Sequence, residues 1–72
     1  MATLNTVTKA YFKKYTGTSS DLVVGLNAVG ADYSFKYRQK IAKANGIKDY
    51  YSNPMQNAKL LTLLKQGRLV RP

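Results

Sequence analysis

The chain has 72 residues and a formal net charge of +9 at pH 7, because 12 lysines and arginines stand against 3 aspartates. This length allows one small domain, and the charge points to a polyanion or an anionic surface as the partner. The absence of Cys and His excludes disulfides, Cys- or His-based metal sites and His-dependent catalysis. The three aspartates lie near predicted turns or helix starts, where an N-cap or turn role explains them. We therefore expect no enzyme, no metal site and no cofactor.

Residues 1–10, MATLNTVTKA, are polar and rich in threonine, which predicts a linker or lead-in. They lack the basic and apolar regions of a signal peptide, and no apolar run approaches the ~18–20 residues that cross a bilayer. We therefore expect neither a signal peptide nor membrane insertion. Residues 11–72 form the predicted domain, and its first segment, YFKKYTG at 11–17, suits either a short strand or a coil packed on helices.

The first predicted helix covers about residues 20–29. Serine and threonine before it are good N-caps, and Asp21 suits the positive end of the helix dipole. Apolar residues then recur at helical spacing until Gly30 stops the run. The second predicted helix covers about residues 34–45; it starts at Asp32 or Ser34 and ends at an Asn-Gly pair.

The third predicted helix covers about residues 54–66 and has the most complete start signal. Asn53 is a capping residue, Pro54 occupies the first helical position, and Gln56 completes a capping box. A leucine stripe follows and Gly67 ends it.

Together these elements predict an all-α fold, a compact bundle of three short helices with an irregular or short extended N-terminal lead-in. Helices this short are unstable alone in water, so one shared apolar core must hold them together. The predicted core consists of Leu22, Val23, Leu26, Val29, Tyr37, Ile41, Ala44, Ile47, Leu60, Leu61, Leu64 and Leu69.

The predicted second helix also carries a basic face. Lys36, Lys40 and Lys43 recur at i, i+4 and i+7, and Arg38 and Lys48 lie nearby in sequence. A phosphate-bearing polymer can bind such a face through Coulomb attraction and counterion release. A solvated surface is the ordinary alternative for any single lysine.

Six tyrosines and no tryptophan are the second unusual feature. A tyrosine ring can stack on a sugar or base while its hydroxyl reaches a hydrogen-bond partner, although tyrosines also fill the edges of small cores. We expect Tyr37 to belong to the core. The predicted binding surface combines tyrosines for stacking, cations for phosphate or carboxylate and an amide for a glycan: Tyr15, Tyr33, Lys36, Arg38, Lys40, Tyr50, Tyr51 and Asn57.

Five runs of the chain carry a resemblance to a known family. They are YTG at 15–17, GLNAVG at 25–30, YRQKIAKANGI at 37–47, QNAKLL at 56–61 and LKQGRL at 64–69. Taken together and in this order, they resemble the C-terminal cell-wall-binding modules of amidase- and lysozyme-type endolysins and autolysins from Gram-positive bacteria and their bacteriophages.

The resemblance implies a non-catalytic module that anchors a peptidoglycan hydrolase outside the cell, at the cell wall, with peptidoglycan glycan or teichoic acid as its ligand. Such a module raises the local concentration of a catalytic domain on its substrate. Two other functions stay open. Three helices with a basic second helix also suit a small nucleic-acid-binding domain, although a leucine-rich third helix offers few side chains for reading bases. A structural or protein-binding module would instead scatter its cations and tyrosines.

Overall fold

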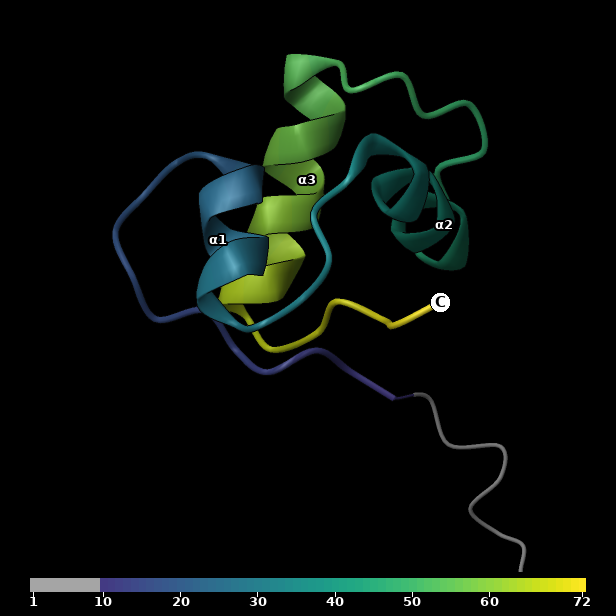
Figure 1. Ribbon diagram of the computed structural model, residues 1–72. Coiled ribbons are helices and arrows are strands. Elements are labelled where there is room, and N and C mark those ends of the chain that lie inside the picture. The colour runs from purple at the N-terminus through teal and green to yellow at the C-terminus, as the bar shows by residue number, and fades with distance from the viewer. Residues whose placement is uncertain (1–9) are drawn as a thin grey trace, which may run out of the picture.

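The computed structural model describes residues 10–72, in which it contains three helices and no strand (Figure 1). Helix α1 spans Leu22–Ala28, α2 spans Phe35–Ala44 and α3 spans Pro54–Lys65. The predicted all-α, three-helix fold is therefore confirmed. The predicted linker at 1–10 lies outside the described residues except for Ala10.

Local side chains begin all three helices. The Asp21 carboxylate accepts a hydrogen bond from the Val23 N–H at 2.8 Å, so Asp21 is itself the N-cap of α1. Ser34 caps α2, which decides between its two predicted starts. At α3 the side chain of Asn53 accepts from the third helical N–H while Gln56 reaches back to the Asn53 N–H, so the predicted capping box is confirmed.

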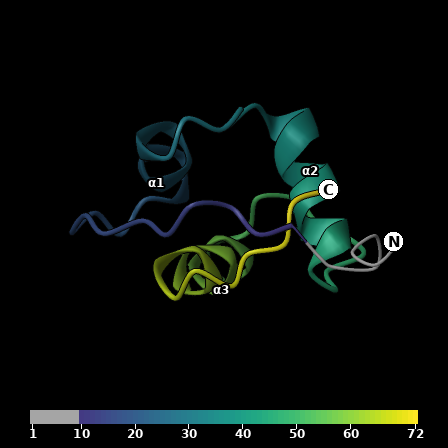
Figure 2. The same ribbon diagram turned by 90° about the horizontal axis from the view of Figure 1, so that it is seen from below.

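Helices α1 and α3 pack on each other, and α2 lies to their side (Figures 1 and 2). Gly25 in α1 permits the close approach, because a Cβ atom there would lie 2.9 Å from Leu61 Cδ1 and 3.1 Å from Leu64 Cδ2 of α3. Residues 29–34 connect α1 to α2, and residues 45–53 connect α2 to α3. This arrangement leaves one side of α2 directed away from α1 and α3.

The segment before α1 and the segment after α3 run side by side below the helices in the view of Figure 1. Tyr11 and Val70 form an isolated antiparallel β-bridge, the Phe12 N–H donates to the Leu69 carbonyl at 2.9 Å, and the Arg71 N–H donates to the Ala10 carbonyl at 2.8 Å. Residues 11–17 are therefore a coil packed on the bundle, with one bridge and no strand.

The core extends beyond the helices. Leu26, Ile41, Leu60, Leu64 and Leu69 are fully buried, as predicted. Ala44 was placed in the core wrongly, because it is exposed on α2. The prediction missed four buried hydrophobic residues, two of them in the segment before α1 and one in the α2–α3 connection: Phe12, Tyr15, Ala42 and Tyr50.

Asn45 joins the end of α2 to the C-terminal segment. Its side-chain amide donates to the carbonyls of Ile41 and Val70, both at 2.8 Å, and its side-chain oxygen accepts from the Val70 N–H at 2.9 Å. Replacing Asn45 by alanine removes all three bonds, so we expect a loss of about 1–3 kcal/mol in the free energy of unfolding. Urea denaturation followed by circular dichroism measures this loss; a stability equal to that of the unsubstituted chain would contradict it.

Candidate anion-binding site

The exposed side of α2 forms a shallow cationic hollow of about 420 Å³, which we call the lysine trough. It is lined by one glutamine and four lysines, namely Lys36, Gln39, Lys40, Lys43 and Lys48. The spacing along α2 explains the first four members, because residues at i, i+3, i+4 and i+7 share one helix face. The opposite face of α2 carries the buried Ile41 and Ala42.

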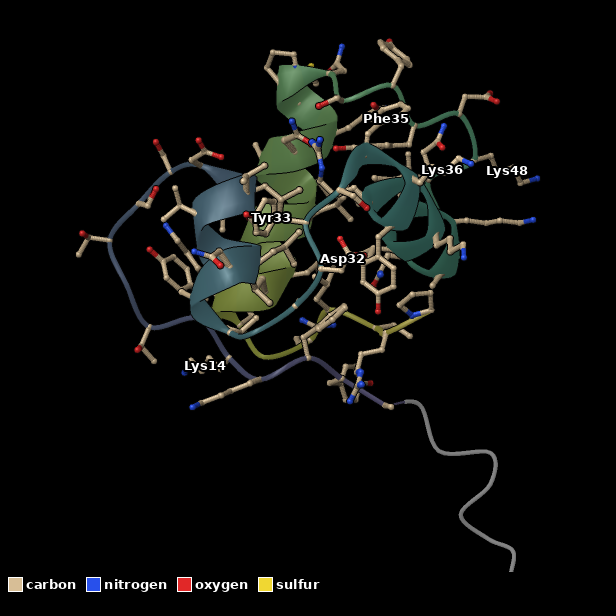
Figure 3. The ribbon with its side chains drawn as sticks, viewed as in Figure 1. Lys14, Asp32, Tyr33, Phe35, Lys36 and Lys48 are labelled. Carbon is tan, nitrogen blue, oxygen red and sulfur yellow. The ribbon has the colours of Figure 1, made fainter. Side chains whose placement is uncertain are left out.

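Lys48 reaches the trough because the chain reverses sharply at the end of α2. The Ile47 N–H donates to the Ala42 carbonyl at 2.8 Å, and Gly46 adopts a φ of +90°, which a residue with a side chain rarely takes. The turn brings Lys48 back beside the helix it follows. Figure 3 shows Lys36 and Lys48 on the same side of the molecule, whereas Lys14 lies at the far end.

The trough concentrates positive charge in one place. Its four lysines are exposed, and no carboxylate is among its lining residues. Like charges this close repel one another, and a ligand carrying several phosphates or carboxylates removes that repulsion while releasing its own counterions. The arrangement therefore suits an extended polyanion.

A second hollow of about 330 Å³ adjoins the trough and shares Gln39 and Lys48 with it. Tyr51 lines this hollow, and its side chain is 66% exposed. Its ring is therefore free to stack on the part of a ligand that extends from the trough into the second hollow. Asp49 is the one carboxylate among the residues that line it.

Two tyrosines of the predicted binding surface are buried, although Tyr50 contributes to the lining of the second hollow. Tyr15 is only 8% exposed and Tyr50 only 5%, so neither ring can stack on a ligand. The Tyr15 hydroxyl accepts a hydrogen bond from the Ser19 N–H at 3.0 Å, so the chain between these two residues folds over the Tyr15 ring. Tyr33 is exposed, but it lies over α1 and α3 in Figure 3 and does not line the trough.

Arg38, Tyr50 and Asn57 lie together and form hydrogen bonds with one another and with Ser52. One guanidinium nitrogen of Arg38 donates to the Tyr50 hydroxyl at 3.1 Å and to Ser52 Oγ at 3.0 Å. The Tyr50 hydroxyl donates to Asn57 Oδ1, and Asn57 Nδ2 donates to Ser52 Oγ at 3.2 Å. Hydrogen bonds within the protein hold these polar groups, and their roles as ligand partners stay predictions.

This network holds the connection that carries Lys48 and Tyr51. Ser52 has a φ of +61°, in the left-handed region, and its hydroxyl oxygen is held by both Arg38 and Asn57. Phe35 adds a stacked contact to the Tyr50 ring, with 5.8 Å between ring centroids. Arg38, Tyr50 and Asn57 therefore fix the α2–α3 connection and, with it, the positions of Lys48 and Tyr51.

Of the predicted binding residues, the structure brings Lys36 and Lys40 into the trough and Tyr51 beside it. The predicted binding surface did not include three other residues that line the trough, Gln39, Lys43 and Lys48. The helical spacing that selected Lys36 and Lys40 also selects Lys43, whereas the position of Lys48 depends on the turn after α2.

Residues 10–72 contain no group of three or more residues of the metal-binding types, and no helix there has the length and apolar character needed to cross a membrane. Comparisons of the chain with known protein families, with curated proteins and with solved structures find no match.

Proposed function

We propose that this chain is a non-catalytic binding module that anchors a peptidoglycan-degrading enzyme to the Gram-positive cell wall. The observation that carries the proposal is the convergence of four lysines in the lysine trough, with the exposed ring of Tyr51 in the adjoining hollow. The resemblance of residues 15–72 to wall-binding modules of lytic enzymes supports the same function.

The trough and Tyr51 suit the two chemistries of such a wall. Lysine ammonium groups bind the phosphates of a teichoic polymer, or the carboxylates of peptidoglycan, as point charges. Tyr51 offers a flat ring beside them, on which a sugar of the same polymer can stack. Binding at the wall then raises the effective concentration of an attached catalytic domain on its insoluble substrate.

Nucleic acid is the main competitor for the same surface, because lysines bind any polyphosphate without reading its sequence. A sequence-reading helix also needs polar side chains directed at base edges. Three leucines of α3 are buried, namely Leu60, Leu61 and Leu64, and the trough adds only Gln39 to its lysines. The wall is therefore the better-supported partner.

A retention experiment separates these two partners. The chain is incubated with purified Gram-positive walls, with the same walls stripped of teichoic acid, and with immobilised duplex DNA, at one ionic strength. We expect retention on walls that exceeds retention on DNA. Retention on DNA without retention on either wall preparation would overturn the proposal.

Two neighbouring tyrosines give a sharper test of the surface. Replacing Tyr51 by alanine should weaken wall retention about threefold to tenfold and leave the circular-dichroism spectrum unchanged, because its ring is exposed. Replacing Tyr50 by alanine should lower the melting temperature, because its ring is buried and its hydroxyl joins the Arg38 network. Unchanged retention in the Tyr51 variant would remove that ring from the site.

A further inference from the structure

A further hollow of about 280 Å³ shares none of the lining residues of the lysine trough. The lead-in, the α1–α2 connection, α2 and the C-terminal segment all contribute to it. The lining side chains that bear on its chemistry are Phe12, Lys13, Val29, Asp32, Tyr37 and Arg71. Unlike the trough, this hollow contains groups of both charges.

The positive groups come from two segments that the backbone ties together. Arg71 lies with its guanidinium carbon 5.8 Å from the centroid of the Phe12 ring. Its backbone N–H donates to the Ala10 carbonyl at 2.8 Å, so the C-terminal segment is fixed against the lead-in that carries Lys13. An arginine fork beside a lysine is well suited to hold a carboxylate.

The negative group is Asp32, on the α1–α2 connection. Its carboxylate oxygen Oδ1 accepts a hydrogen bond from the Ser34 N–H at 2.8 Å, which fixes its position at the start of α2. The backbone N–H of Ser34 makes the larger contribution and the side chain of Ser34 the smaller one, and their hydrogen bonds keep the pKa of Asp32 below its ordinary value. The carboxylate is therefore charged at neutral pH and can hold an ammonium group.

We propose that this hollow binds a peptide of dipeptide size, which carries a free amine at one end and a free carboxylate at the other. The ammonium lies at Asp32, the carboxylate lies at Lys13 and Arg71, and an apolar side chain of the peptide packs on the half-buried Val29 and Tyr37. The volume is close to the lower end of the range for small-molecule sites, which runs from ~300 to 1,000 Å³. A bare phosphate or a polyanion fits less well, because Asp32 repels it.

This site is independent of wall anchoring through the trough, and a defined probe tests it alone. Alanyl-alanine is titrated into the full ¹⁵N-labelled chain, followed by its N-acetylated form and by its C-terminal amide. We expect saturable shifts at the backbone N–H groups of Gly30 and Ala31, with each blocked form binding about tenfold more weakly. Equal binding of all three forms, or no saturable shift at millimolar concentration, would overturn the proposal.

Two variants test which residue binds the carboxylate of the dipeptide and which binds its ammonium group. Arg71→Gln should weaken binding of the free dipeptide about tenfold and leave binding of its C-terminal amide unchanged. Asp32→Asn keeps an oxygen that can accept from Ser34, and it should weaken the free dipeptide while leaving the N-acetylated form unchanged. A trough variant, Lys43→Gln, should bind all three forms as the unsubstituted chain does. Equal losses for every form in the first two variants would also count against the site.

Discussion

Replacing Leu64 by alanine should leave much of the chain unfolded at room temperature. Leu64 is fully buried in α3, its Cδ2 atom faces Gly25 of α1, and its carbonyl accepts from the Tyr15 N–H at 3.1 Å. A cavity at such a position costs about 2–5 kcal/mol, whereas a core of this size supplies roughly 3–5 kcal/mol in total. Thermal and urea denaturation followed by circular dichroism measure the loss.

Leu63→Ala is the matched control, since it removes the same atoms from the next residue of the same helix. Leu63 is only partly buried at the edge of the core, so we expect a smaller loss of about 1–2 kcal/mol. Equal losses in the two variants would contradict the packing of α3 on α1.

The helices were predictable because their signals are local. The Asn53 cap, Pro54 and Gln56 lie within four consecutive positions, and they act through bonds that close inside the same turn. The same locality makes one face of α2 basic, so the lysine spacing indicated the trough before its shape was known. Asp21 shows the limit of such signals: its neighbourhood marked a helix start, but several residues there were acceptable caps.

The burial of Phe12, Tyr15 and Tyr50 was not predictable from local signals. Phe12 and Tyr15 lie on irregular backbone, where no periodicity distinguishes an inward from an outward side chain. Tyr15 is buried because its N–H pairs with the carbonyl of Leu64 in α3, at the other end of the chain. Tyr50 is buried because Arg38 and Asn57, from two different helices, converge on its hydroxyl. Only the tertiary fold creates these contacts.

Removing the charge of the lysine trough should have the largest effect on wall binding. The variant Lys36→Gln, Lys40→Gln, Lys43→Gln and Lys48→Gln keeps good helix formers on α2 and removes four of the twelve positive side chains. We expect retention on teichoic-acid-bearing walls to fall at least about tenfold, because each lysine that neutralises a phosphate releases about one counterion. The slope of log affinity against log salt concentration should fall by about 3 for the same reason.

A charge-matched variant tests whether position or total charge matters. Lys14→Gln, Lys59→Gln, Lys65→Gln and Arg68→Gln remove the same number of charges from residues that line neither the trough nor the peptide-binding hollow. If the trough is the site, this variant keeps most of the wall affinity and most of the salt dependence. Salt at 0.1 M largely screens the attraction between the wall and any lysine or arginine that lies more than ~10 Å from it. If both variants lose affinity equally, the chain is held by its overall charge, and the convergence of four lysines beside α2 has no specific role in wall binding.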